Sequence, residues 1–383
     1  MADGAAPALQ RYGHHTVAGG AHACVVTAPR TPHSTPAPLT PHSSLLTVRA
    51  TRPALKDGTS FSPLLNGCWT LAGGHGRLEP AKMLEVMEEH ALAGLTTFDT
   101  ADIYGPSEQV LGAFREAWAT RHPTLAPPEV FTKLVPNIFR ERPTKATVEA
   151  AIQRSCAALR TRQLDCVQLH WWDYSVPGML DVGKWLTELQ AAGKIRSLGV
   201  TNLDCTLLRA LLDAGVPIVS NQVQFSLLDR RPLNGMVQLC EQRGVKLLTY
   251  GTLAGGLLSD RYVAAPKQGL PFVGPRYPPV DLNTSSLKMY WRNVGSEPGW
   301  RSLLDTLRAI ADRHSTTVAA VALRWAMDAG PVHPIVGMRN ASHISDNLAA
   351  LALQLDAADR ARIDEALKAC PGPQGDCYSE ERS

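Results

Sequence analysis

The sequence predicts an α/β protein, a single (β/α)8 TIM barrel domain that follows a disordered N-terminal extension, on three observations. Short apolar or β-branched runs recur eight times from about residue 64, segments with helical spacing lie between them, and glycines stand before several of the next runs. This alternation specifies a parallel sheet. Because no second domain is evident, a closed barrel of eight strands is the economical arrangement.

The eight runs are the predicted strands, and helices connect them. The helix after Pro80 shows the spacing, because Met83, Met87 and Ala91 fall on one of its faces. Glycines close several predicted helices just before the next strand: Gly94, Gly193, Gly215 and Gly244. The predicted strands are 64–71, 96–101, 130–135, 164–171, 195–202, 218–225, 246–251 and 333–338.

An open doubly wound sheet is the main alternative architecture. When such a fold binds a dinucleotide, it carries GxGxxG after an early strand, and this sequence has no such motif. The glycine-rich GGHG at 73–76 lacks the spacing and is interpreted as a loop. The closed barrel is therefore favoured.

Residues 1–55 differ in composition from residues 56–383, which are assigned to the barrel. Before Asp57 the only acid is Asp3, whereas arginines are scattered among many Ala, Ser, Thr, His and Pro residues. Such a segment cannot bury a core, and two interpretations stay open, a disordered extension and an organelle transit peptide. A transit peptide would place the protein in a plastid or mitochondrion; otherwise a cytoplasmic location is expected.

Composition narrows the classes of function. The chain is 44% hydrophobic and carries a formal charge of +3 with acids and bases interspersed, so no basic face indicates a nucleic-acid partner. No apolar run has the length of a membrane span. The eight cysteines form no CxxC pair, which argues against a zinc ribbon or a disulfide framework and predicts free thiols. The oligomeric state is left open.

Polar side chains occur where three successive predicted strands end. Asp99 ends the second strand with Tyr104 in the loop behind it, Lys133 lies in the third strand and His170 in the fourth. Taken singly, each has an ordinary structural explanation as a helix cap, a surface residue or a core residue. Together they predict one site, because buried lysine and aspartate are costly unless they pair, and barrel active sites lie at the C-terminal ends of the strands.

From residue 61 to the C-terminus the sequence resembles the aldo-keto reductase superfamily. The resemblance implies a (β/α)8 barrel that transfers hydride between a nicotinamide cofactor and a carbonyl, with Asp99, Tyr104, Lys133 and His170 as its catalytic tetrad. The family's aspartate lies five positions before its tyrosine, so Asp102 is interpreted as a loop or capping residue. The motifs stand in the family's order and at comparable spacing: FDTADIYG, FTKL, LHWW, IRSLGVTN, SNQVQF, LLTYGTLAGG and PIVGMRNASHISDN.

Carbonyl reduction explains the residue types of the tetrad. A carbonyl that receives hydride develops an alkoxide, which needs a positioned proton donor. Tyr104 would be that donor, Lys133 would stabilise its phenolate, and Asp99 would hold the ammonium of Lys133 in place. His170 would hydrogen-bond the substrate oxygen and orient the carbonyl.

The resemblance also implies cofactor contacts across the same mouth. Thr201, Asn202 and Gln222 would bind the nicotinamide carboxamide, and Tyr250 would stack on the ring. The loop at the pyrophosphate would be Gly251, Thr252 and Leu253, and the adenosine end would meet Gly337, Arg339, His343, Asp346 and Asn347. The guanidinium of Arg339 suits the 2′-phosphate of NADP, which is favoured, and NAD remains the alternative.

Aromatic side chains near the strand ends predict a substrate pocket walled by Trp69, Trp171 and Trp172. Such a pocket suits a small carbonyl or alcohol substrate with an apolar or sugar-like body. The connection over 252–300 is too long for a simple link, and such loops act as lids or binding flaps.

Other functions have less support in the sequence. There is no HxH on an early strand, no HExxH and no GxSxG, so no metal site is predicted and a serine hydrolase is disfavoured. The alternative from a different class is a cofactor-binding redox-sensor subunit, similar to the channel-associated members of the superfamily, with little turnover.

Overall fold

The computed structural model describes residues 52–72, 80–263 and 290–379. They all belong to one compact unit, Pro38–Ser383. The predictions for residues 1–51, for the GGHG loop and for the central part of the 252–300 connection lie outside the described residues.

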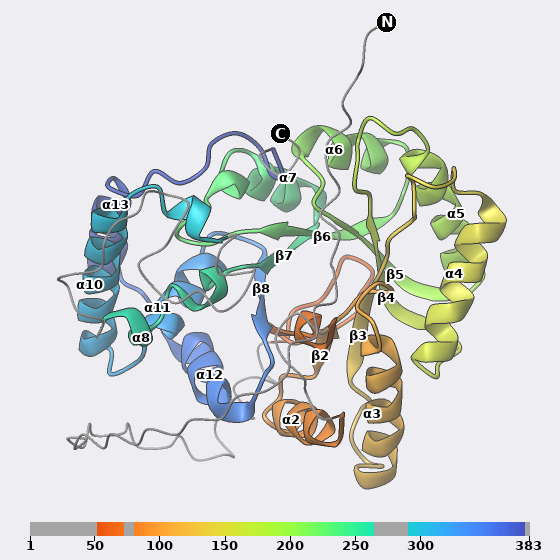
Figure 1. Ribbon diagram of the computed structural model, residues 1–383, viewed down its shortest axis with the longest axis horizontal. Helices are drawn as coiled ribbons and strands as arrows, with labels where there is room; N and C mark the ends of the chain where they lie inside the picture. Colours follow the sequence, from red (N-terminus) through yellow and green to blue (C-terminus); the bar gives the residue numbers. More distant parts are fainter. Residues whose placement is uncertain (1–51, 73–79, 264–289, 380–383) are drawn as a thin grey trace, which may run out of the picture. The chain divides into compact units, whose positions relative to one another are not determined.

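Eight parallel strands close into a barrel in chain order, and the last strand pairs with the first (Figure 1). The strands are β1 (Leu65–Gly67), β2 (Thr97–Asp99), β3 (Glu129–Leu134), β4 (Leu164–His170), β5 (Ile195–Thr201), β6 (Ile218–Gln224), β7 (Lys246–Tyr250) and β8 (Val332–Gly337). Each strand lies within or overlaps its predicted run, so the predicted fold class is confirmed. The first run was predicted too long, because Trp69–Ala72 forms the 3-10 helix η1 instead of strand.

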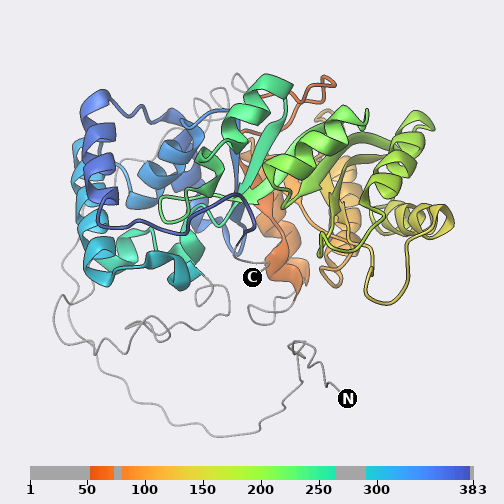
Figure 2. The same cartoon turned by 90° about the horizontal axis from the view of Figure 1, so that it is seen from above.

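Helices surround the barrel, as the two views in Figures 1 and 2 show. They are α2 (Pro80–Leu92), α3 (Ser107–Arg121), α4 (Lys145–Ala158), α5 (Met179–Ala191), α6 (Cys205–Asp213), α7 (Met236–Arg243), α8 (Asp260–Val263), α10 (Glu297–Arg313), α11 (Val318–Met327), α12 (Ile344–Ala352) and α13 (Ala357–Leu367). The short 3-10 helices are η2 (Arg231–Leu233), η3 (Ala254–Gly256), η4 (Arg292–Val294) and η5 (Ala341–His343).

Capping residues determine where several helices begin or end. Thr144, Asp204 and Thr317 each accept a hydrogen bond from the backbone N–H three residues later, which fixes the first turns of α4, α6 and α11. Gly244 ends α7 at a φ of 65°, a conformation that glycine adopts without a steric penalty. The predicted role of this glycine as a helix terminator is confirmed.

Apolar side chains pack in two main clusters. The larger lies between the strands and helices of the first part of the barrel and includes Phe114, Trp118 and Trp171. The second surrounds α10, α11 and α13, and in it the rings of Trp291 and Trp300 pack edge to face with centroids 5.4 Å apart. These two tryptophans near the end of the long connection are therefore core residues.

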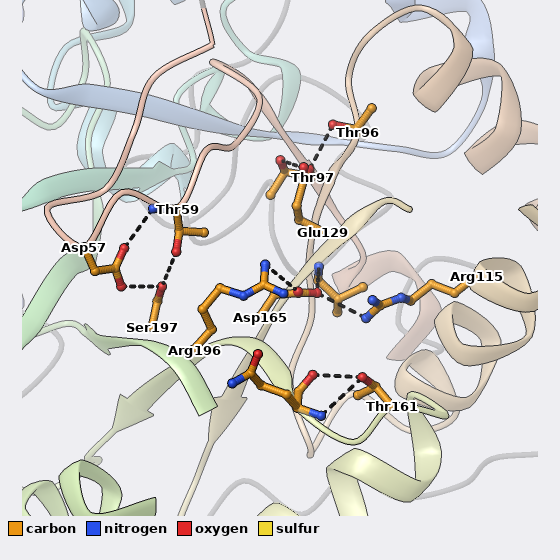
Figure 3. A network of polar contacts seen from close by, with 12 residues as sticks. Asp57, Thr59, Thr96, Thr97, Arg115, Glu129, Thr161, Asp165, Arg196 and Ser197 are labelled. Carbon is orange, nitrogen blue, oxygen red and sulfur yellow. Dashed lines mark hydrogen bonds and ion pairs between the residues drawn. The ribbon is translucent and has the colours of Figure 1, made fainter. Parts of the chain in front are cut away.

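A polar network lies at the N-terminal ends of β2 to β5 (Figure 3). The carboxylate of Asp165 in β4 accepts a hydrogen bond from Val130 N (3.0 Å) and pairs with Arg115 (3.1 Å) and Arg196 (3.2 Å). Glu129 in β3 accepts from the hydroxyls of the two threonines that precede or begin β2. Because the Asp165 side chain is only 4% exposed, these partners offset the cost of burying its charge.

Candidate active site

Four polar side chains meet at the opposite end of the barrel. Asp99 is the last residue of β2, His170 is the last residue of β4, and Lys133 is next to last in β3. Tyr104 lies in the turn between β2 and α3. The strand ends bring these residues together as the sequence predicted, because parallel strands of a barrel finish at one mouth.

A buried ion pair lies at the centre of this group. Lys133 Nζ is 2.7 Å from Asp99 Oδ2, and both side chains are at most 5% exposed. The same ammonium donates to Thr100 O (2.9 Å) and lies 4.9 Å from the centroid of the Tyr104 ring. Burial opposes the charge of Lys133, but the attraction of Asp99 and Tyr104 raises the pKa of the ammonium above its usual value. Lys133 is therefore a cation at neutral pH.

Tyr104 keeps its proton in this structure. Burial raises the pKa of the phenol, and the nearby Lys133 ammonium opposes that rise. A protonated phenol beside a fixed cation can give up its proton to a strong base and be stabilised as the phenolate.

His170 is a neutral imidazole. Burial, together with the positive charge of Lys133, lowers its pKa to about 4. Its ring stacks on Trp172, with centroids 4.6 Å apart and an interplanar angle of 29°. Asn202 Nδ2 lies 3.4 Å from His170 Nε2, which links the histidine to the end of β5.

Two glutamines orient Asp99. Its Oδ1 accepts hydrogen bonds from Gln168 Nε2 (2.9 Å) and Gln222 Nε2 (2.7 Å), and Gln222 also donates to Gln168 Oε1 (2.8 Å). Gln222, predicted at the nicotinamide carboxamide, thus binds the carboxylate of Asp99. The sequence reasoning missed Gln168, although a glutamine within an apolar strand two residues before His170 was an available signal.

Asn202 is held in a left-handed conformation, with a φ of 61°, which asparagine adopts more readily than most residues. Its N–H donates to Gln222 O (2.7 Å), and its carbonyl accepts from the Tyr174 hydroxyl. The hydroxyl of Tyr250 donates to Asn202 Oδ1 (3.0 Å). These contacts bring the predicted carboxamide residues and Tyr250 together beside His170.

Buried polar atoms without hydrogen-bond partners among the described residues occur on Thr201 (Oγ1) and Asn347 (Nδ2). Such atoms are costly unless a bound molecule supplies the missing partner. At Gly337 an added Cβ would meet no atom within 4 Å, whereas at Gly251 it would lie 2.5 Å from the Tyr290 ring. The two unpartnered atoms belong to residues predicted to contact the cofactor, and each could bond a polar group of a bound dinucleotide.

The remaining predicted cofactor residues follow strands β7 and β8. Thr252 is buried and donates to Thr249 O (3.1 Å), and Leu253 comes directly after it. Arg339 and His343 are exposed between β8 and α12, and burial raises the pKa of Asp346 in the first turn of α12.

Exposed apolar side chains follow three of the strands at the mouth. Trp69 and Trp172 are 44% and 42% exposed, and Ile103, beside Tyr104, is 51% exposed. Trp171, predicted as pocket wall, is fully buried, and its indole N–H donates to Val176 O (3.1 Å). Residue 171 therefore packs in the core, and Ile103 is a mouth residue that the sequence reasoning did not single out.

The sequence model of the aldo/keto reductase family matches residues 63–368. The chain belongs to this family. The aldo/keto reductase is 29% identical to "Pyridoxal reductase, chloroplastic" of Arabidopsis thaliana over 329 residues, which are 82% of this chain and 85% of that protein. It is 31% identical to "Flagellar radial spoke protein 5" of Chlamydomonas reinhardtii over 282 residues, 64% of this chain, and spans about half (51%) of that protein.

Solved structures share the fold of this aldo/keto reductase. One is the crystal structure of an aldo/keto reductase from Klebsiella pneumoniae in complex with NADP and acetate, with a TM-score of 0.62 and 22% identity over 85% of this chain and 97% of that one. Within residues 52–72, 80–263 and 290–379, no helix has the length and apolar character that a membrane crossing requires. In the same ranges no three His, Cys, Asp or Glu side chains are grouped as a metal site.

Proposed function

We propose that this aldo/keto reductase is an NADP-dependent oxidoreductase that reduces aldehydes or ketones to alcohols, or runs the reverse reaction, with Tyr104 as the proton donor. The observation that carries the proposal is the buried Lys133–Asp99 pair beside the Tyr104 phenol. A lysine fixed as a cation next to a tyrosine has a specific use, the stabilisation of a phenolate.

The cofactor would lie between Thr201 and Asn347, whose buried polar atoms lack partners among the described residues. Asn202 and Tyr250 would flank its nicotinamide, while Arg339 would face a phosphate at its adenosine end. NADPH, when bound, supplies the hydride. The NADP complex of the Klebsiella relative supports NADP as the dinucleotide.

Residues of the chain would orient the substrate carbonyl and transfer the proton. The neutral His170 can donate a hydrogen bond to the substrate carbonyl oxygen and so fix its orientation at pH values well above 4. The oxygen takes the proton of Tyr104 as it becomes an alkoxide, and the O–H bond of the phenol breaks. Lys133 stabilises the resulting phenolate, and Asp99 holds the ammonium where the phenolate forms.

Planar aldehydes are the substrates that we expect to react fastest. Trp69, Ile103 and Trp172 offer exposed apolar surface at the mouth, and the Trp172 ring already stacks on His170. The name of the Arabidopsis relative makes pyridoxal the first aldehyde to assay. The same chloroplastic relative supports the transit-peptide interpretation of the N-terminal segment, which N-terminal sequencing of the mature protein would test.

Tyr104→Phe tests the proposed reaction. The variant removes the proton donor but keeps the ring, so we expect turnover to fall by about a factor of 10³ or more while NADPH affinity changes little. Consumption of NADPH with pyridoxal and a panel of other aldehydes and quinones measures the first, and fluorescence titration measures the second. Unchanged turnover in the variant would contradict the role of Tyr104.

The alternative is a cofactor-binding redox-sensor subunit with little turnover; the name of the Chlamydomonas relative states an assembly and no catalytic activity, which keeps a non-enzymatic role open. The same assay separates the two functions. Wild-type protein that binds NADPH tightly but reduces none of the carbonyls would favour the sensor subunit, whereas multiple turnovers would favour the enzyme.

A further inference from the structure

The turn that carries Tyr104 is hydrogen-bonded to β3 beyond the end of β2. Thr100 N donates to Phe131 O (2.8 Å), and Asp102 N donates to Lys133 O (3.3 Å). These bonds continue the parallel pairing of β2 with β3 by alternate residues. They place the turn in register with the strand that carries the catalytic lysine.

Asp102 completes this ladder with its side chain. The chain turns away after residue 102, where Tyr104 N bonds back to Ala101 O (3.1 Å). On the β3 side, the next N–H in this ladder is that of Val135. It donates to a side-chain atom, Asp102 Oδ2 (3.2 Å), and not to a backbone carbonyl. The main chain and the side chain of one aspartate therefore bind the β3 side at Lys133 and at Val135.

The surroundings of Asp102 are unusual for a residue that only closes a turn. Its Oδ1 is buried with no partner among the described residues, beside a cavity of about 180 Å³. Four charged or titratable groups surround the carboxyl from the neighbouring elements: Glu108 on α3, Lys133 on β3, Glu141 in the connection after β3, and Arg154 on α4.

The carboxyl titrates close to neutrality. Burial raises the pKa of Asp102 to about 7 and Glu108 adds to the rise, while the Val135 N–H, Arg154 and Lys133 oppose it. Ionisation strengthens the bond that Val135 N–H donates, because hydrogen bonds to a charged acceptor are shorter and stronger. It also costs stability, because the charge is buried with one oxygen unpaired.

We propose that Asp102 is a positioning residue for the reaction proposed above: through Val135 and Lys133 it holds the Tyr104 turn against β3. This inference rests on the proposed function for its catalytic consequence. Its structural content, a turn whose rigidity depends on the hydrogen bonds of Asp102, stands independently of turnover.

Two substitutions separate the contributions. Asp102→Ala removes the acceptor, and we expect kcat to fall about tenfold at every pH because the phenol is no longer fixed over the ammonium. Asp102→Asn keeps an acceptor for the Val135 N–H, so it should retain most of the wild-type kcat. Asp181→Asn, an exposed aspartate in the first turn of α5, is the control and should match wild type.

Stability and hydrogen exchange give readouts that need no substrate. The folded pKa of Asp102 lies above that of an unfolded aspartate, so its contribution to stability is lost as pH rises through about 7. Asp102→Asn should therefore melt at a higher temperature than wild type at pH 8. Amide exchange in residues 100–107, compared at one pH, should be faster in Asp102→Ala than in wild type and close to wild type in the asparagine variant.

Three outcomes decide the matter. Wild-type kcat in Asp102→Ala would overturn the proposal, and so would a tenfold loss of kcat in Asp102→Asn. If Asp102→Ala fails to fold, the asparagine variant alone decides. If wild type reduces no carbonyl, the proposed function fails, while the exchange experiment still shows whether Asp102 fixes the turn.

Discussion

The hydroxyl of Thr201 illustrates what single residues reveal about the cofactor site. It is buried at the end of β5 without a partner among the described residues. Such a group lowers the stability of the free protein, and the carboxamide proposed to bind here would supply the missing hydrogen bond. The same reasoning applies to the amide of Asn347 in α12.

Thr201→Val removes this hydroxyl with little change in shape. We expect the free protein to be more stable by about 1 kcal/mol, because a buried unpaired oxygen is lost. NADPH should bind about five- to tenfold more weakly, because the carboxamide loses a partner. Thermal melts without cofactor and a fluorescence titration measure the two effects. A variant with unchanged affinity would argue against the placement of the carboxamide at residue 201.

The identities of the candidate site residues were predictable from the sequence, but several of their contacts were not. Asp99, Lys133 and His170 follow from their places at strand ends. The bond from Gln222 to Asp99 depends on which way a side chain turns inside the barrel, and sequence spacing does not determine that. Likewise, Trp171 and Trp172 are adjacent, yet one is fully buried and the other is 42% exposed.

Among the elements, α3 and α4 pack as closely as backbone atoms allow. The contact occurs at Gly112 of α3, where an added Cβ would lie 2.2 Å from Ala158 O at the end of α4. A helical glycine is otherwise less favourable than alanine. Its presence on α3, the helix that follows the Tyr104 turn, is explained by this contact.

Gly112→Ala should therefore destabilise the fold by about 1 to 3 kcal/mol, because one helix must move to admit the methyl group. Gly183→Ala on α5 is the matched control, since its Cβ would meet side-chain carbons of Val216 (3.3 Å) and Leu211 (3.6 Å) and no backbone atom closer than these. The control gains helix propensity and should be neutral or slightly stabilised. Chemical denaturation of both variants measures the difference, and equal stabilities would contradict the packing argument.

The elements themselves were largely predictable. All eight strands lie within or overlap their predicted runs, because buried parallel strands are continuous apolar segments between helices. The first run failed at its end, since a run of apolar residues does not distinguish the end of a strand from the 3-10 helix that begins at Trp69.

At the scale of the whole molecule, histidines with lowered pKa values make the fold sensitive to acid. His333 in β8 packs edge to face against Phe61 with ring centroids 4.8 Å apart, and burial lowers its pKa to about 4. His170 is held neutral in the same way. An unfolded histidine takes up its proton near pH 6.5, so the folded protein binds fewer protons between the two values.

The contribution of these histidines to the free energy of unfolding should be fully maintained above about pH 6.5. It should fall as pH decreases toward 4, by about 3 kcal/mol for His333 alone. His333→Gln should have a shallower decline over that range. Denaturant midpoints at several pH values, compared between wild type and the variant, measure it. Parallel declines in the two proteins would show that residue 333 is protonated in the native state.

The polar network around Asp165 and Glu129 has a practical meaning for protein engineering. Its hydrogen bonds and ion pairs join β2, β3, β4 and β5 at the end of the barrel that faces away from Tyr104. None of them involves Asp99, Tyr104, Lys133 or His170. Libraries of variants that change the loops at the mouth would leave these contacts unchanged. The substrate range of the barrel can thus be changed by recombining the loops at its mouth, while the N-terminal ends of the strands are kept unchanged.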